Sequence, residues 1–536
     1  MQESSEIPNI SILSKMREFN VTGLCIPEKH YMVDISEKVR QTAAMVEKGR
    51  YFTINRARQY GKTTIIRQLE KVLLEKGYLV ARISFEGIGD TPFENEKNFC
   101  LNLLEQISEA FDMCSIKGYR LWRDKTITSF YKLNVFLDKM CKDKKVVLII
   151  DETDKTSNNL IFLRFIGVLR DKYLGRESPK KATFQSVILA GVYDIKNLKL
   201  KMIQAGTNEL QDSEERINSP WNIASDFKVD MSFSTPEIAT MLNEYEKDHQ
   251  TRMDIKAISE EIRAYTSGYP YLVSRLCKIV DEKLGKDWTL NGIHNAVKLI
   301  LEENSTLFDD IIKNMESSKE LFDLLHNIII SGENFIYNNF NPTIRLGVMF
   351  GILSDENRVL AIHNRIFELF ICEYFISLKD TDPQKSRAGT VISEIIENGK
   401  FDMALAIKKF MQHYYELYNK SNETFLESEC RLLFLTFLRP LINGAGFYHI
   451  ESKTRNLRRT DLIIDYGTEQ FIVELKIWYG EQKHEKAYEQ LIEYLNSKNK
   501  SEGYLLTFDF RKRRAKKPSV KWIRKGKKKF LDCLCV

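Results

Sequence analysis

At 536 residues the chain is longer than one hydrophobic core ordinarily supports, which indicates two to four domains. Hydrophobic residues make up 43% and charged residues 29%, a balance that excludes long disordered stretches. No apolar run approaches the length of a membrane helix, and the polar first residues lack the apolar core of a secretory signal. We therefore expect a cytoplasmic protein without membrane segments.

Residues 45–235 alternate short apolar runs with longer helical stretches, which predicts a parallel sheet covered by helices on both faces. The expected strands are YFTIN (51–55), YLVARISF (78–85), KVVLIID (145–151), SVILAGV (186–192) and FKVDMSF (227–233). These strands predict one α/β domain over this range.

The segment after the first expected strand, NRARQYGKTT, matches the P-loop pattern at Gly61, Lys62 and Thr63. Arg56 stands where the pattern has its first glycine. In such a loop Lys62 reaches the β- and γ-phosphates and Thr63 holds Mg²⁺, while backbone N–H groups cradle the phosphates. The residues expected to bind the nucleotide here are Arg56, Arg58, Gly61, Lys62, Thr63 and Thr64.

A second motif follows the strand over 145–151, which ends in Asp151 and Glu152. We expect Asp151 to hold Mg²⁺ through water and Glu152 to orient or deprotonate the attacking water. A GKT triplet alone is common. Both motifs, however, end strands of one expected parallel sheet, where ligands bind. Together they predict an ATP-hydrolysing P-loop enzyme.

The next regions are helical. Residues 236–315 carry helical periodicity that is interrupted at Gly268–Pro270, and residues 316–380 predict short helices and a small hairpin around ILSDENRVLAI. Residues 381–425 are polar and helical, and we expect them to be a linker.

Residues 426–536 return to strand-like runs, and the segment 458–478 predicts a β-hairpin that turns at Tyr466–Gly467. Asp461 begins the first strand, while Glu474 and Lys476 share one face of the second. Two carboxylates of this kind bind Mg²⁺, which polarises a scissile phosphate, and the lysine stabilises the developing charge. Charged residues commonly alternate on strands, so the pattern alone favours an ordinary surface strand.

Several segments resemble one family, the prokaryotic AAA-ATPase-like proteins, from residue 27 onward. They are HYMVDIS (30–36), YFTINRARQYGKTT (51–64), VVLIIDETD (146–154), SPWNIA (219–224), TSGYPYLVSRL (266–276) and NPTIRLGVMFGILSDENRVLAIHNRIFELF (341–370). The resemblance implies an ASCE-type P-loop sheet in the order 5-1-4-3-2, arginine at position 56, and a winged helix over 316–380. It also implies that Tyr31 lies near adenine. Gly268 and Pro270 resemble the helical lid of STAND ATPases.

The same family pairs its ATPase with a C-terminal PD-(D/E)xK nuclease-like domain, similar to restriction endonucleases. This resemblance implies catalytic roles for Asp461, Glu474 and Lys476 beside a metal. It implies Glu427 as a further metal ligand, with Glu429 as its competitor. Gln490 and Tyr494 match the Q-x-x-x-Y helix that accompanies such strands.

Twelve Lys or Arg and no acid lie within residues 511–529, whereas the whole chain has a net charge of +6. The positive charge is therefore local, and we expect it to follow a nucleic-acid backbone, with DNA as the partner. Part of the block could instead form an edge strand, because KWI and FLDCLCV are apolar enough to pair.

The sequence therefore predicts an α/β multidomain protein with a P-loop ATPase domain (1–235), a helical lid (236–315), a winged helix (316–380), a helical linker (381–425) and a nuclease-like domain (426–536). Its expected cofactors are ATP and Mg²⁺, with Mn²⁺ as a substitute for the metal. We expect a homo-oligomer, because a neighbouring subunit often supplies the catalytic arginine of such enzymes. Three functions stay open: an ATP-controlled nuclease suited to prokaryotic defence, an ATP-switched scaffold that binds without cutting, and an ATPase with a C-terminal oligomerisation module.

Overall fold

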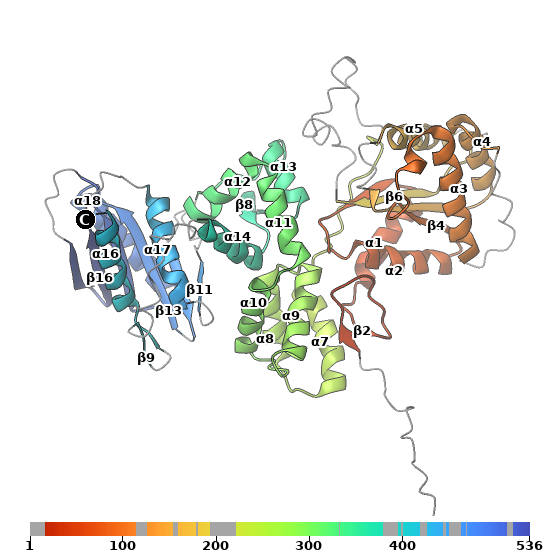
Figure 1. The fold of residues 1–536 in the computed structure, drawn as a ribbon. Coiled ribbons are helices and arrows are strands. Elements are labelled where there is room, and N and C mark those ends of the chain that lie inside the picture. Colours follow the sequence, from red (N-terminus) through yellow and green to blue (C-terminus); the bar gives the residue numbers. More distant parts are fainter. Residues whose placement is uncertain are drawn as a thin grey trace, which may run out of the picture. The chain divides into compact units, whose positions relative to one another are not determined.

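The computed structural model describes residues 17–113, 126–153, 159–177, 181–192, 221–331, 333–378, 395–397, 400–418, 426–442, 446–449, 462–467, 469–511 and 518–536. The chain forms two compact units (Figure 1). The first comprises Met1–Ile300 with Met349–Gly351, and the second Leu301–Val348 with Ile352–Val536. Within the described ranges, no helix is both long and apolar enough to cross a bilayer.

A four-stranded parallel sheet forms the centre of the first unit, in the order β3-β6-β5-β4. Its strands are β3 (Phe52–Asn55), β4 (Leu79–Ser84), β5 (Val146–Asp151) and β6 (Ser186–Gly191). Strand β6 therefore lies between the strand before the P-loop and the strand that ends in Asp151. This arrangement confirms the predicted order for four strands.

The prediction of a strand over 227–233 is wrong, because this segment is irregular. Just before it, Ser225 forms an isolated parallel bridge to Phe52. The reason is a competing hydrogen bond. The Val229 carbonyl, which a strand would use in its ladder, accepts from Arg56 Nη2 at 3.2 Å. The Phe227 ring stacks on Phe52 instead, with the ring centroids 5.7 Å apart.

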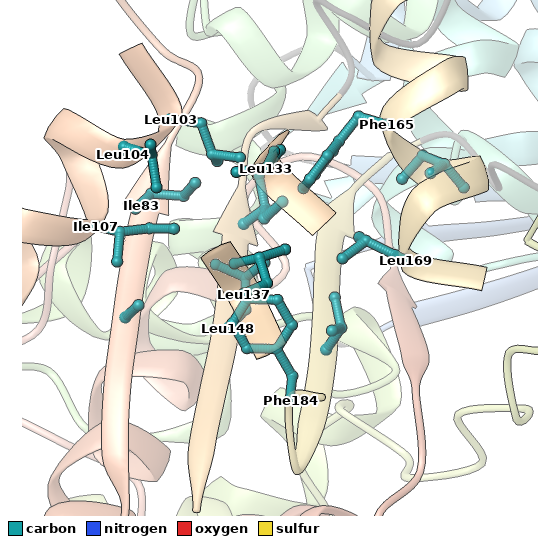
Figure 2. Packing of buried hydrophobic residues seen from close by; sticks show 14 of the residues in the cluster. Ile83, Leu103, Leu104, Ile107, Leu133, Leu137, Leu148, Phe165, Leu169 and Phe184 are labelled. Carbon is teal, nitrogen blue, oxygen red and sulfur yellow. The ribbon is translucent and has the colours of Figure 1, made fainter. Parts of the chain in front are cut away.

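Helices cover both faces of this sheet (Figure 1). One face carries α1 (Ser36–Glu47) and α2 (Lys62–Glu75), and the other carries α3 (Glu96–Met113), α4 (Phe130–Cys141) and α5 (Leu160–Gly175). Figure 2 shows the core between the sheet and the helices α3, α4 and α5, where Leu103, Leu137 and Phe165 pack toward Ile83 and Leu148 of the sheet. Short elements complete this part: β1 (Glu18–Phe19), β2 (His30–Tyr31) and the 3₁₀ turn η1 (Thr91–Phe93).

Four further helices follow in the first unit, namely α7 (Thr235–His249), α8 (Ile255–Thr266), α9 (Pro270–Glu282) and α10 (Leu290–Leu301). The predicted break between α8 and α9 is confirmed, and Gly268 there has φ +73°. A Cβ atom at Gly268 would lie 2.0 Å from the Phe233 carbonyl oxygen. Only glycine fits this close approach to the residue before the α7 cap.

The second unit begins with helices and a small hairpin. Its elements are α11 (Thr306–Glu316), α12 (Lys319–His326), the π-helical turn η6 (Asn327–Ser331), α13 (Pro342–Met349), β7 (Leu353–Glu356), β8 (Val359–Ile362) and α14 (Arg365–Ser377). The predicted hairpin is confirmed as β7 and β8, joined by Asn357 and Arg358 with φ of 55° and 69°. Ile336 adds an isolated antiparallel bridge to Val359.

A six-stranded mixed sheet completes the second unit, in the order β11-β12-β13-β14-β16-β15. The strands are β11 (Gly446–His449), β12 (Leu462–Tyr466), β13 (Glu469–Ile477), β14 (Glu502–Phe508), β15 (Ser519–Lys525) and β16 (Lys528–Cys535), with a separate pair β9 (Ile396–Glu397) and β10 (Lys400–Phe401). The predicted hairpin is confirmed as the antiparallel pair β12 and β13. Strand β15 lies at the sheet edge, as the apolar residues of the basic block indicated.

Three helices pack on this sheet: α16 (Met403–Tyr418), α17 (Glu427–Ile442) and α18 (Glu481–Ser497). Helix α18 contributes Leu491 and Leu495 to a core with Leu505. Helix α16 lies in the range that we expected to be a linker, yet Phe410 and Tyr414 pack on Phe508, with ring centroids 6.2 and 5.3 Å apart. This helix is therefore part of the cover of the sheet.

Candidate functional site

The loop after β3 contains two residues in the left-handed conformation and leads into a helix N-terminus. Gln59 and Gly61 both have left-handed φ, 56° and 75°, on either side of Tyr60. Gly61 is the N-cap of α2, so the first turn of that helix opens directly onto the loop. Left-handed residues in a loop and a helix N-terminus both concentrate positive potential, which suits an anion such as a phosphate.

Lys62 lies inside this loop with 7% of its surface exposed. Its ammonium group donates to the carbonyl oxygens of Arg56 and Ala57, both at 2.9 Å. These bonds hold the ammonium group against the backbone of the loop.

Thr63 and Asp151 meet at the carboxyl end of the sheet, with Thr63 Oγ1 3.5 Å from Asp151 Oδ2. Burial raises the pKa of Asp151, and the Glu152 N–H and the Lys62 charge partly oppose this rise. A hydroxyl beside a carboxylate supplies hard oxygen ligands, which fit Mg²⁺. Glu152 follows with φ 53°, a left-handed conformation that is uncommon for glutamate and is characteristic of functional sites.

A cavity of about 680 Å³, a size typical of small-molecule sites, is lined by Lys62, Thr63 and Glu152 but not by Asp151. Of the predicted residues, Arg58, Gly61, Lys62, Thr63, Thr64 and Glu152 line it. The other walls come from residues 20–25, from Lys38 on α1, and from Pro270, Tyr271 and Ser274 on α9. Sequence reasoning did not identify these wall residues, although the Gly268–Pro270 turn marked where α9 begins.

Arg56 and Tyr31 lie differently from the other predicted residues. The Arg56 guanidinium donates to the carbonyl oxygens of Asn55 and Val229, which gives it a structural role in this conformation. Tyr31 lines the cavity but is only 3% exposed, and its hydroxyl donates to Asp248 at 2.9 Å.

A second, smaller pocket of about 300 Å³ lies in the second unit, where Glu427 of α17, Lys476 of β13 and Gln490 of α18 line it together. Lys476 Nζ is 3.0 Å from Glu474 Oε1 and 3.4 Å from Glu427 Oε1. Glu474 is fully buried on the same strand face. The structure thus brings together four predicted residues from three elements.

The predicted residues Tyr494 and Glu429 are not among the described residues that line this pocket. Tyr494 is buried in the core beneath α18, and Asp461 lies outside the described residues. The Glu429 carboxylate accepts from the Leu426 N–H at 2.7 Å at the start of α17, so Glu427 is the acid that faces the pocket. Among the described residues, no group of three or more His, Cys, Asp or Glu side chains is arranged to hold a metal.

The rim of the smaller pocket contains residues that sequence reasoning missed, including Trp478, Tyr479, Lys483 and His484. His484 Nε2 is 3.3 Å from Asp532 Oδ1. Burial alone would raise the pKa of Asp532, but the contacts with His484, Tyr488 and Lys521 together lower it below its ordinary value. No local signal reveals this rim, since β13, α18 and β16 meet only in the folded sheet.

The described part of the basic block, Arg511 and residues 518–529, contains several ion pairs. Arg511 pairs with Asp509 at 2.7 Å, and Lys529 pairs with Glu502 at 2.9 Å. Lys525 also pairs with Glu485, and Lys521 Nζ is 3.7 Å from Asp532 Oδ2. These pairs reduce the positive charge that the block alone would present.

A parallel sheet with a phosphate-type loop after β3, an acidic strand end on β5 and the intervening strand β6 defines the P-loop ATPase-like class of proteins. Residues 28–373 match the family model described as AAA-like domain, and the chain belongs to that family.

The known proteins similar to this chain are distant. An uncharacterized WD repeat-containing protein of Synechocystis sp. is 22% identical over 334 residues, which span 58% of this chain and 26% of that protein. The Walker-type ATPase PABY2304 of Pyrococcus abyssi has a TM-score of 0.45 and 12% identity, and the match covers 66% of this chain and 99% of the other. The Aeropyrum pernix ORC2 protein in its ADP form has a TM-score of 0.35 and 11% identity, covering 68% and 98%. The family assignment rests on the AAA-like match.

Proposed function

We propose that this protein binds and hydrolyses ATP in its first unit and thereby controls a metal-dependent nuclease in its second. The substrate would be a nucleic-acid phosphodiester, with DNA as the expected polymer. Defence against foreign nucleic acid would suit this pairing, by analogy with other ATPase–nuclease fusions. We further propose a homo-oligomer, in which a second copy supplies the catalytic arginine.

The cavity over the P-loop supports the ATPase role. Lys62 would neutralise the phosphates, and Thr63 and Asp151 would hold Mg²⁺, which spreads the charge that develops on the transferred phosphoryl group. Glu152, on the cavity wall, would orient the attacking water and accept its proton.

One observation carries the nuclease proposal: Glu427, Lys476 and Gln490 come from separate elements yet line one pocket, with Glu474 3.0 Å from the lysine. Glu474 and Glu427 would hold a metal together with Asp461, and the metal would polarise the phosphate. Lys476 would stabilise negative charge on the phosphorus centre.

Arg431 supports a route of control within the second unit. It is 3% exposed, and its guanidinium donates to the Ile330 carbonyl in η6 and lies 3.5 Å from Glu427. A π-helical turn such as η6 often marks a functional position. A shift of η6 would therefore reach Glu427 through one side chain. The β7–β8 hairpin and the Ile336 bridge support a winged-helix origin for this region.

The alternative, an ATP-switched scaffold that binds without cutting, is favoured by the ion pairs. Lys476 contacts both glutamates, and several cations of the basic block have acidic partners. Such contacts could serve only to stabilise the domain.

Cleavage assays separate these two functions. Wild type, Glu474→Gln and Lys476→Ala would be incubated with duplex and single-stranded DNA and RNA in Mg²⁺ or Mn²⁺. A nuclease loses about 100-fold or more of its activity in both variants, since each removes charge stabilisation at the reacting phosphate. Binding without cutting in the wild type, unchanged in the variants, would favour the scaffold.

A further inference from the structure

Two adjacent aromatic residues follow β13 at the rim of the pocket lined by Glu427 and Lys476, and they differ in exposure. Trp478 is 6% exposed and packs with Leu534 and Val536. Tyr479 is 66% exposed and lines the pocket. The sheet therefore anchors one ring and leaves the next ring on the rim, open to a ligand.

Three lysines line the pocket together with Tyr479. Lys483 Nζ lies 4.3 Å from the centroid of the Tyr479 ring. Lys486, almost one turn further along α18, lines the pocket together with Lys476. Among the described residues that line this pocket, Glu427 is the one with an acidic side chain. An aromatic ring next to several ammonium groups is the combination that proteins use to hold a single strand by base stacking and phosphate contact.

We propose that this rim holds an unpaired nucleotide, whose base stacks on Tyr479 while Lys483 and Lys486 contact the flanking phosphates. In a duplex both faces of each internal base are covered by neighbouring bases, so a protruding tyrosine reaches only an unpaired or terminal base. The substrate class is therefore single-stranded nucleic acid, or a single-stranded end. This assignment rests on the nuclease function proposed for the same pocket.

Binding measured apart from cutting tests the assignment. Fluorescence anisotropy would follow the full chain with labelled single strands of about 12 nucleotides, in DNA and RNA forms, in Ca²⁺ instead of Mg²⁺. Duplex binding would be measured by competition with a relaxed closed-circular duplex, which has no unpaired or terminal base. We expect Tyr479→Ala to weaken single-strand binding by about tenfold and to leave duplex binding unchanged, because one stacked base is lost. Tyr479→Phe should bind like the wild type, since it keeps the ring.

Tyr415→Ala is the matched control, because Tyr415 is an exposed tyrosine of the same unit, 47% exposed on α16. Equal single-strand binding by Tyr479→Ala and wild type, or tighter wild-type binding to the duplex, would overturn the proposal. Glu474→Gln separates the two claims. If the wild type never cuts but single-strand binding depends on Tyr479, the nucleotide-binding rim is supported and the nuclease function is not. If cutting requires Glu474 but not Tyr479, the nuclease function is supported and the nucleotide-binding rim is not.

Discussion

We expect the proposed nucleotide site to depend on Lys62 more than on any other residue. Its ammonium group is buried in the loop and held by two carbonyl oxygens. We expect Lys62→Ala to weaken nucleotide binding at least about tenfold and to abolish hydrolysis. A titration with a fluorescent ATP analogue measures the first effect. Lys71→Ala, on the solvent face of the same helix, is the control and should bind normally.

We expect Asp151 to give the proposed nucleotide site a pH-dependent stability. Burial raises the pKa of Asp151 in the folded protein, so folding favours the protonated carboxyl. The stabilisation from this protonated form is therefore complete below the ordinary aspartate pKa, and it is lost as the pH rises through the raised pKa of the folded state. Asp151→Asn stays neutral, so without nucleotide it should melt above the wild type at neutral pH. This advantage should shrink toward about pH 4. A melting-temperature difference that did not change with pH would contradict the assignment.

Local signals explain which site residues the sequence revealed. Lys62, Thr63, Asp151 and Glu152 follow apolar strands within short motifs, and Glu474 and Lys476 alternate on one strand. Tyr479 and His484 carry no such signal, because their surroundings come from three separate elements. The hydrogen bond of the Arg56 guanidinium could not be predicted either, because its acceptor, the Val229 carbonyl, is distant in sequence.

At the scale of elements, Gly268 ties the start of α9 to the residue that precedes the α7 cap. Gly268→Ala should destabilise the first unit by about 3 kcal/mol, because its Cβ would collide with the Phe233 carbonyl and the residue would keep a left-handed φ. Gly77→Ala is a matched control, with φ +80° and open space around the added Cβ. It should cost about 1 kcal/mol. Equal urea midpoints for the two variants would show that the close approach is unimportant.

Elements were predictable where hydrophobic pattern alone determines them. The four strands of the first sheet and the β7–β8 and β12–β13 hairpins follow from apolar runs and turn residues. The segment 227–233 has an equally strand-like pattern, yet Arg56 takes the Val229 carbonyl, which is a tertiary effect. The helix α16 looks polar enough for a linker, and only its contacts with Phe508 make it part of the sheet's cover.

At the scale of the whole molecule, the AAA-like match covers residues 28–373 and extends into the second unit, whose later part carries a carboxylate–lysine pocket. P-loop proteins order nearby segments around the terminal phosphate of the nucleotide and release them after hydrolysis. We therefore expect the nucleotide state of the first unit to change activity at the second.

The most direct test of this central claim is nucleic-acid cleavage by the full chain with no nucleotide, with ATP and with a non-hydrolysable ATP analogue. Wild type would be compared with Lys62→Ala and Glu474→Gln. We predict that cleavage by the wild type changes by about tenfold or more between nucleotide states, that Lys62→Ala cuts at one rate in all of them, and that Glu474→Gln does not cut. Cleavage by the wild type at one rate in every nucleotide state, or undiminished cleavage by Glu474→Gln, would contradict the account.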